Sequence, residues 1–400
     1  MSTRTDRGAT SRDSQVDLMH GWGEQSEMMV EFREGFERHS PGTSLNGMSV
    51  SNVSLEAKRR ILTEDPPDMW ACWVGPNLQP YHNAGVLGDV TDVWTDSGME
   101  RAFHDVAKDA VRFDGAYRGL PLNVQRTNLL FANLPLVEKA GVNHDRVDDP
   151  REFVELLAQV DDAIEEDPMV VGFVQPFASQ GLYMWEAVYL AMHGERAYLD
   201  LVEGDSRSRR SEAKQALEML EEILGYANDD AINTTEGTES DRFARGEAAF
   251  RMQGMWAGLN LSHTDLEYGT GWDAMALPGT GGQHVINMDG FAVPSAAPHP
   301  ESTAAFVEYA GSADGIEGFN RAKRSIPTRT DVPTDGLPPF VAEQTEAFRR
   351  SNSHLPSIAH GLAAPPETLV DLEVAFADSV ADRDADAAAG TIVQAFASAE

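Results

Sequence analysis

The stretch "VDLMHGWGEQSEMMVEFREGFERHSP", residues 16–41, decides the fold because two structural patterns follow each other in it. Its opening, "VDLMHGW", is a short apolar run, which is typical of a buried strand. Met28, Met29, Phe32 and Phe36 then recur at a spacing that places them on one stripe of a helix. The stretch therefore predicts a strand followed by a helix, the unit from which α/β folds are built.

The alternation of strand and helix continues along the chain. Residues 66–75, "PPDMWACWVG", predict a turn and a second apolar run, and residues 87–94, "LGDVTDVW", predict a connection capped by aspartates. Further elements follow: amphipathic helices at 149–167 and 208–229, a buried strand running into a helix or turn at 248–258, and a strand and helix at 288–294 and 302–312. These elements predict an α/β fold with mixed sheets, in which residues 324–339 form the longest loop.

Composition indicates a globular protein and excludes several classes of partner. With 400 residues and 42% hydrophobic content, the chain can bury a large core, and its length predicts two or three domain-sized bodies. The 65 acidic against 31 basic residues give a formal net charge of -34, which disfavours nucleic acids and anionic lipid as partners. At molar salt the Debye length is about 3 Å, so this self-repulsion is screened. We expect a halophilic protein.

Signals of compartment are few. Cys72 is the only cysteine, so no disulfide can form within the chain. No run approaches the roughly 18 apolar residues of a membrane span, and no signal-peptide core follows Met1. Residues 1–15 are polar, and we expect a flexible tether there, either one that follows an export signal or an ordinary disordered tail.

Signatures of catalysis are missing from the sequence. It has no Gly-rich phosphate loop, nucleophile elbow, H-E-x-x-H pair or cysteine cluster, and its 11 histidines lack the spacing of metal ligands. We therefore expect no metal, no cofactor and no enzymatic activity. A catalytic pair of carboxylates among the 65 acids stays open as an alternative, although no motif singles one out.

Aromatic and polar residues follow several predicted strands, where open α/β sheets bind ligands. Each residue alone is more often structural, but together they predict a site for a polyol. Flat rings can cover the apolar face of a sugar, while Asp, Asn, His and Lys side chains bond its hydroxyls. The residues are His20, Trp22, Trp70, Trp73, Asn123 to Asn128, Trp256, Asp289 and His360.

Six fragments form a pattern that is specific only when they are taken jointly. They are "PPDMWACWVG", "YRGLPLNVQRTNLLFANLPLVEKAGV", "RGEAAFRMQGMWAG", "MDGFAVPSAAPHPESTAAFVEY", "FNRAKRSIPTR" and "SIAHGLAAP". In this order the chain resembles the extracellular solute-binding proteins of carbohydrate ABC transporters, the glucose-binding branch most of all, over about residues 16–400. The resemblance implies the periplasmic-binding-protein type 2 fold, in which two α/β lobes joined by crossing strands enclose a ligand cleft at the hinge.

The family fold also implies discontinuous lobes. We expect an N-terminal lobe at 16–120 plus 283–330 and a C-terminal lobe at 121–282 plus 331–400, after the tether at 1–15. Two consecutive compact domains are the alternative, which the order of the motifs disfavours.

The resemblance assigns ligand-binding roles one residue at a time. Trp256, Asp289 and His360 match a stacking tryptophan, an acid and a histidine of the family. Trp73 stands where the glucose-binding relatives have a histidine, so a stacking surface replaces a hydrogen-bond donor. Glu236 stands where relatives often have a second tryptophan, so one wall of the pocket lacks that ring.

The other assigned residues lie nearer the N-terminus. His20, Trp22 and Glu24 fall in the equivalent first strand-to-helix loop, and Asn123 and Gln125 are also expected to bind the ligand.

Lys323, in "FNRAKRSIPTRTD", matches the family's lysine and is one of few lysines in a chain whose basic residues are mostly arginines. A compact ammonium group fits against one or two hydroxyls where the planar fork of arginine is too large. A structural ion pair with a nearby carboxylate is the alternative.

The resemblance implies a non-catalytic binding protein outside the cell, associated with the cell surface and monomeric. It would capture a monosaccharide, glucose or a similar hexose, by hinge closure and deliver it to ABC permease subunits. One alternative is a binding protein that feeds a chemosensory receptor. Another is a secreted carbohydrate-active enzyme, which needs two carboxylates about 5 to 10 Å apart across the cleft.

Overall fold

The chain opens with strand β1 (Gln15–His20) and helix α1 (Glu27–His39), as the sequence predicts, and the four apolar residues of the predicted helical stripe are buried. In this computed structural model, which describes residues 14–23, 26–173, 178–203, 206–382 and 384–398, β1 belongs to a five-stranded sheet. Its strand order is β2 (Ser44–Ser49), β1, β3 (Met69–Trp73), β13 (Asp289–Ala292) and β6 (Gly119–Pro121).

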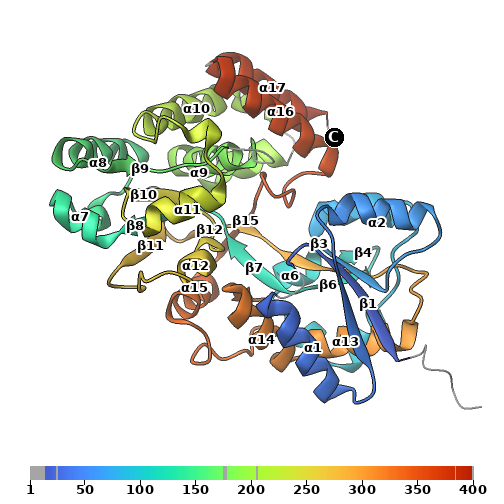
Figure 1. Cartoon of the computed structure of the whole chain (residues 1–400). Helices are drawn as coiled ribbons and strands as arrows, with labels where there is room; N and C mark the ends of the chain where they lie inside the picture. Colours follow the sequence, from blue (N-terminus) through green and yellow to red (C-terminus); the bar gives the residue numbers. More distant parts are fainter. Residues whose placement is uncertain (1–13, 24–25, 174–177, 204–205, 383, 399–400) are drawn as a thin grey trace, which may run out of the picture.

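Helices from the N-terminal part of the chain and from residues 300–323 accompany this first sheet, and α1 packs on α13 and α14. The lobe is drawn mostly in blue and orange because its strands and helices come from distant parts of the sequence (Figure 1). The elements are α2 (Val53–Leu62), α3 (Gln79–Asn83), α4 (Thr91–Asp96), α5 (Met99–Ala102), α6 (Asp105–Asp109), α13 (Pro300–Ala310), α14 (Ala313–Lys323) and the hairpin β4 (Arg112–Phe113) with β5 (Ala116–Tyr117).

A second sheet forms the core of the other lobe. Its strand order is β11 (Trp272–Ala276), β8 (Leu129–Asn133), β10 (Ala248–Gln253) and β9 (Asp167–Met169). The helices of this lobe are α7 (Leu134–Ala140), α8 (Pro150–Ala163), α9 (Ala178–Val202), α10 (Arg210–Leu224), α11 (Glu236–Ala244), α12 (Ala257–Leu261), α16 (Pro366–Asp382) and α17 (Ala385–Ala397).

A third sheet links the two lobes (Figure 1). Its strand order is β14 (Ile326–Pro327), β7 (Asn123–Arg126), β12 (Gln283–Asn287) and β15 (Ser353–Pro356), and α15 (Pro339–Arg350) joins the two edge strands. The chain passes from the first sheet to the second through β6, β7 and β8, and returns through β11, β12 and β13. The chain therefore crosses repeatedly between two α/β lobes. The predicted ends of the lobes, at residues 120 and 121, 282 and 283, and 330 and 331, stay predictions.

One local prediction differs from the structure, and one strand was not predicted. Residues 87–94 were expected to form a connection, but α4 begins at Thr91, where a helical turn buries Trp94. Strand β2 had no prediction because its sequence, "SLNGMS", has little apolar character. It exists because its backbone pairs in parallel with all six residues of β1, an interaction that a local pattern does not reveal. In the part of the chain that the structure describes, no helix is both long and apolar enough to cross a bilayer.

Three histidines surround Phe348 beside the linking sheet. Their ring centroids lie 5.1 Å, 5.8 Å and 4.0 Å from that of Phe348 for His104, His284 and His354. Burial lowers the pKa of His104 to about 4 and that of His284 to about 2, and it also lowers the pKa of His354. All three rings are therefore neutral in the folded protein near neutral pH.

This cluster predicts a loss of stability in acid. The folded-state pKa of His104 lies below the unfolded value of about 6.5, so the unfolded chain binds more protons in this window and the free energy of unfolding falls as the pH falls. We expect His104→Gln to reduce that fall between pH 6.5 and 4 by on the order of 1 kcal/mol, since solvent partly screens the group. Urea titrations at several pH values measure the free energy of unfolding of the wild type and the variant. If that free energy falls with pH equally in both proteins, the prediction is contradicted. His263→Gln, at an exposed histidine, is the control.

Candidate functional site

A cavity of 210 Å³, here called the inner chamber, lies where the two lobes and the linking sheet meet. The first lobe contributes Trp73, Asp289 and Lys323, from the end of β3, the start of β13 and the end of α14. The remaining walls come from the second lobe, from the linking sheet and from the turn after β15.

The linking sheet contributes polar side chains to the lining of the inner chamber. Gln125 of β7 is the antiparallel partner of Asn287 in β12, and both line the cavity. Two residues further along, Asn123 braces Asp289: its Nδ2 donates to Asp289 Oδ2 at 3.0 Å, and its Oδ1 accepts from the Asp289 backbone N–H at 2.8 Å. Alternation along β7 places Asn123 and Gln125 on the same face of that strand.

Aromatic rings form another part of the wall. The ring of His360 lies 5.2 Å from Trp73 and 5.3 Å from Trp256, both edge to face, and 5.9 Å from Tyr183, stacked. Trp73 comes from the first lobe and the other rings from the second lobe and the turn after β15, so the cluster spans the cleft. Burial lowers the pKa of His360 to about 3, so its imidazole is neutral.

A buried carboxylate orients the polar groups of the second lobe. Nε1 of Trp256 donates to Oε1 of Gln253 at 3.1 Å, and Nε2 of Gln253 donates to Glu239 at 3.1 and 3.0 Å. Nε2 of Gln180 donates to the same carboxylate at 3.0 Å. Burial raises the pKa of Glu239 to about 7. Because both amides turn their nitrogens to Glu239, the oxygen of Gln180 is left as an acceptor for the chamber.

Lys323 is the one positively charged residue among the described residues that line the inner chamber. Its Nζ lies 3.7 Å from Asp289 Oδ2, and both side chains are mostly buried, with 17% and 15% exposed. That distance allows charge attraction but exceeds the range of an N–H···O hydrogen bond. Lys323 is therefore paired in charge with Asp289 without a hydrogen bond between the two groups.

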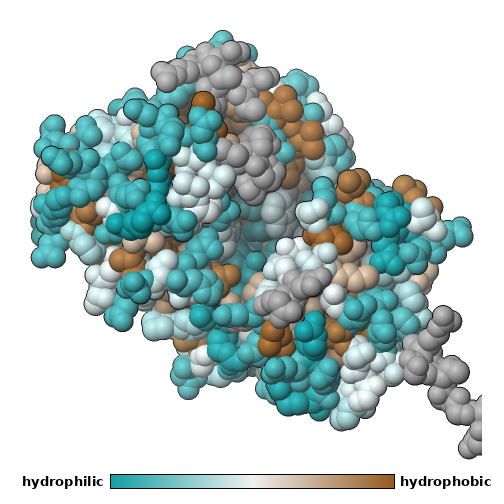
Figure 2. All heavy atoms as spheres, viewed as in Figure 1, coloured by the Kyte–Doolittle hydropathy of each residue, from teal (hydrophilic) through white to brown (hydrophobic). Residues whose placement is uncertain are grey.

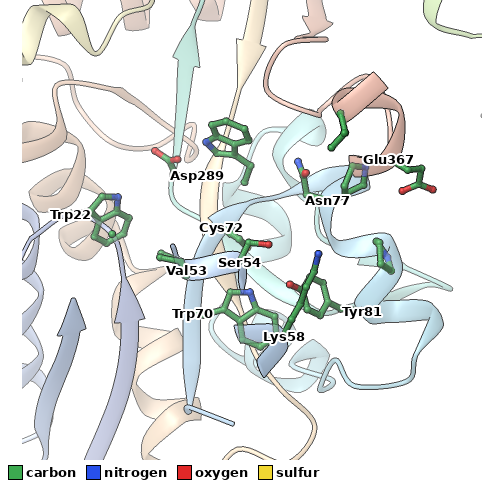
Figure 3. A pocket seen from close by; sticks show the side chains of 16 residues that line it. Trp22, Val53, Ser54, Lys58, Trp70, Cys72, Asn77, Tyr81, Asp289 and Glu367 are labelled. Atoms are coloured by element: carbon green, nitrogen blue, oxygen red, sulfur yellow. The ribbon is translucent and has the colours of Figure 1, made fainter. Parts of the chain in front are cut away.

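A second cavity of 700 Å³, the outer chamber, shares Trp73 and Asp289 with the inner one. Figure 3 shows Trp22, Trp70 and Tyr81 on the first lobe, with Glu367 of α16 across from them. The molecule is visibly hollowed between its lobes (Figure 2). The inner and outer chambers are thus two parts of one longer cleft.

One group of possible metal ligands occurs away from the cleft. Among the described residues, ligand atoms of Asp17, Asp68 and His299 lie within 4.8 Å of one another. Asp68 already accepts hydrogen bonds from the backbone N–H of Asp17 and from the backbone and ring nitrogens of His299. These hydrogen bonds give the Asp68 carboxylate a structural role, in which it holds His299 at the start of α13.

The structure brings together most of the residues that the sequence singled out. Trp22 lines the outer chamber instead, while His20 and Asn123 are buried and line neither cavity. Glu24 lies outside the described residues, so its role stays a prediction. The predicted residues that line the inner chamber are Trp73, Gln125, Trp256, Asp289, Lys323 and His360.

Sequence reasoning missed four lining residues, Gln180, Tyr183, Gln253 and Asn287. Gln253 and Asn287 are the last residues of β10 and β12, and a polar residue at the end of a buried strand was a usable signal. Tyr183 gave none, because in an apolar helix it resembles a core residue. Glu236 lines the chamber, as expected at a position that lacks the family's second tryptophan, and Tyr183 brings a ring to the same wall.

Gln125 provides a test of the inner chamber as a binding site. It is 2% exposed, and neither atom of its amide has a hydrogen-bond partner among the described residues. Such a group costs about 1–3 kcal/mol unless a ligand satisfies it. We expect Gln125→Leu to raise the free energy of unfolding by about 1 kcal/mol and to weaken, about tenfold, the binding of whichever sugar stabilises the wild-type protein.

Calorimetric titration and urea unfolding measure the two effects. The matched control is Gln344→Leu, which removes another buried glutamine whose Oε1 accepts from Arg126 at 3.3 Å and should lower stability. A Gln125→Leu protein that is less stable and binds sugar as before contradicts the prediction.

Comparisons with known proteins agree with this geometry. The xylose/arabinose-binding protein XacG of Haloferax volcanii is 31% identical over 379 residues, covering 92% of this chain and 81% of the relative. An uncharacterized ABC transporter extracellular-binding protein of Pyrococcus horikoshii is 26% identical over 400 residues, with coverage of 96% and 88%.

Solved structures show the same fold. A chitin oligosaccharide binding protein superposes with a TM-score of 0.82 at 16% identity and coverage of 96% and 98%, and a maltose-bound MalE3 of T. maritima with a TM-score of 0.75 at 16% identity and coverage of 96% and 98%. The chain has the two-lobed α/β fold of solute-binding proteins, which bind their solute rather than convert it. A family model described as bacterial extracellular solute-binding protein matches residues 55–349, and the chain belongs to this family.

Proposed function

We propose that this chain is the sugar-binding component of an ABC importer and that the inner chamber holds one monosaccharide unit. The observation that carries the proposal is the combination, in one cavity, of aromatic rings with polar side chains, among which the amide of Gln125 has no partner among the described residues. Rings cover the apolar face of a sugar, while amides, a carboxylate and an ammonium bond its hydroxyls. A relative with 31% identity is named for binding xylose and arabinose, which supports a small sugar.

The size of the chamber supports a single sugar ring. Its 210 Å³ corresponds to about seven water molecules at their share of liquid volume, about 30 Å³ each. Glucose or a similar hexose is the ligand that the sequence predicts, and the pentoses in the relative's name are its direct competitors.

Closure of the lobes is the proposed mechanism. Trp73, Asp289 and Lys323 approach the ligand from the first lobe, and Trp256 and the residues around it from the second. A ligand that bonds both sides is bound more tightly in the closed state, so it shifts the population toward that state. The permease would then recognise the closed form at the outer face of the membrane.

The outer chamber supports a second candidate ligand, a longer saccharide. It continues from Trp73 and Asp289 toward Trp22 and Tyr81, so a second sugar unit linked to the first would lie against rings there. This candidate keeps the transport role and changes only the length of the ligand.

The charge of the chain supports a role in concentrated salt. With a formal net charge of -34, the folded protein repels itself in dilute buffer, and molar salt screens this repulsion. We propose that the protein is halophilic, and the binding experiments below are therefore set in molar salt.

A panel of sugars tests the proposed function. We expect one or more of glucose, galactose, xylose and arabinose to raise the thermal unfolding midpoint. A sugar at about 100 times its dissociation constant adds roughly 2.7 kcal/mol of stability. If neither these sugars nor their disaccharides shift the transition, the proposal is wrong. If a disaccharide binds at least tenfold more tightly than its own monosaccharide, the longer ligand is favoured.

Lys323 tests which group of the chamber binds the ligand. A hydrogen bond to a charged group is worth about 1.5–3 kcal/mol, so Lys323→Met should weaken sugar binding roughly ten- to hundredfold. Lys323→Arg should also weaken it, because the planar fork does not fit the space of a compact ammonium group. Calorimetric titration of both variants measures the effect.

A purely structural ion pair with Asp289 predicts a different pattern. Lys323→Arg would then bind sugar like the wild type, and Lys323→Met would lower the unfolding midpoint in a manner that depends on salt. Lys214→Met, which removes an exposed lysine paired with Glu218 on α10, is the control and should change neither property.

A further inference from the structure

Glu186, on α9, is a fully buried carboxylate close to the turn that carries His360. Its Oε2 accepts hydrogen bonds from the backbone N–H groups of Ile358 at 2.5 Å and Ala359 at 3.3 Å, and the hydroxyl of Tyr198 lies 3.2 Å from the same oxygen. Its Oε1 lies 2.7 Å from Oγ of Ser357. The carboxylate thus fixes the backbone of the turn after β15 through these hydrogen bonds.

Ser357 links this carboxylate to the inner chamber. Its Oγ also lies 2.8 Å from Nδ1 of His360, which lines the cavity. A serine hydroxyl has one proton, so it donates to only one of these two neighbours. An ionised carboxylate can only accept, and a hydrogen bond to it is stronger than one to a neutral ring. Ser357 therefore donates to Glu186 and accepts from an N–H on Nδ1 of His360.

The chain of hydrogen bonds from Glu186 through Ser357 to His360 is here called the relay. The hydroxyl of Thr127 does not take the place of Ser357 in it. It lies 3.4 Å from Oε1 of Glu186 and equally far from the carbonyl oxygen of Val285, so it is the weaker partner of that carboxylate oxygen. Among the described residues, no charged side chain forms a hydrogen bond or an ion pair with Glu186.

We propose that Glu186 is a positioning residue for ligand binding, because through Ser357 it holds His360 in the tautomer that presents Nε2 to the ligand as a hydrogen-bond acceptor. No partner of Nε2 is found among the residues that the structure describes. The inference rests on the proposed function only in taking the ligand to be a sugar. The inference specifies the chemistry of the cavity wall at His360: its Nε2 selects a ligand hydroxyl that donates a hydrogen bond.

Protonation of Glu186 reverses the relay. The two backbone N–H groups occupy Oε2, so the added proton stays on Oε1, and this O–H donates a hydrogen bond to Oγ of Ser357. The Ser357 hydroxyl then donates to Nδ1 of His360. Nδ1 therefore releases its own proton to solvent while Nε2 takes one up from the cavity side, and the ring stays neutral.

The pKa values support this order of events. Burial raises the pKa of Glu186 to about 7 and lowers that of His360 to about 3, so between these pH values the proton resides on the carboxyl group. Tyr198, the other titratable group in contact with Glu186, has its pKa raised well above the usual value by burial and stays neutral. The cavity side of His360 therefore changes from acceptor to donor as the pH falls through about 7.

Nitrogen NMR of the sugar-free protein tests the proposal. Protein labelled with ¹⁵N-histidine gives long-range ¹H–¹⁵N patterns that distinguish the two tautomers, and loss of one pattern in His360→Asn assigns the residue. We expect the wild type to carry the proton on Nδ1 at pH 8.5 and on Nε2 at pH 5.5, without becoming charged. A wild-type ring protonated on Nε2 at pH 8.5 overturns the proposal.

Three variants separate the relay from a merely structural role. In Glu186→Gln the amide oxygen must take the position of Oε2 to accept from the backbone, so its nitrogen donates to Ser357 and His360 should carry its proton on Nε2 at both pH values. Ser357→Ala should give the same result with Glu186 intact. Tyr198→Phe removes a contact of Oε2 outside the relay and should keep the wild-type tautomer at pH 8.5.

Sugar binding adds a second readout. Glu186→Gln and Ser357→Ala should weaken binding roughly three- to tenfold, and Tyr198→Phe less than twofold. If Glu186→Gln does not fold, Ser357→Ala and the wild-type pH series still decide the question. An Nδ1 proton that persists in Ser357→Ala contradicts the relay. Because the NMR experiment contains no sugar, its failure is distinct from a failure of any sugar to bind.

Discussion

The antiparallel pairing of β7 with β12 is the constraint on which both the link between the lobes and the inner chamber depend. The register that sets Gln125 against Asn287 also sets Asn123 beside Asp289, and alternation along β7 places Asn123 and Gln125 on the same face. A slip of β7 by one residue would turn the side chain of Gln125 to the other face of the sheet, away from the chamber. Since the same two strands carry the chain between the lobes, the polar groups of Gln125 and Asn287 lie where the two lobes are joined.

Two buried carboxylates organise the rest of the site without facing the ligand. Glu239 orients the amides of Gln180 and Gln253 and, through Gln253, the ring of Trp256. Glu186 gathers the backbone of the turn that carries His360. Burial of each charge is costly, and the hydrogen bonds that each one accepts offset this cost while locking neighbouring groups in one orientation. A rigid wall of this kind reduces the ordering that a sugar must impose when it binds.

Local pattern was sufficient where a residue's role follows from its own segment. Apolar periodicity identified β1, α1, α8 and α10, because each buries a stripe that is legible in the sequence. It failed for β2, which is held by pairing with β1, and for α4, whose short helix depends on the packing of Trp94. Residues of the site behaved in the same way: Trp256 and Asp289 stood out, whereas Tyr183 looked like core.

The sequence by itself determined an acidic α/β protein, its family resemblance and six residues that meet in the inner chamber. Only the tertiary structure decided that Trp22 lines the outer chamber, that Asn123 braces Asp289 from behind, and that Gln180, Tyr183, Gln253 and Asn287 complete the wall. The physical reason is that a binding site requires side chains from strands far apart in sequence to converge. Their convergence is set by sheet register and by buried hydrogen bonds, which act between segments and leave no periodic trace within any one of them.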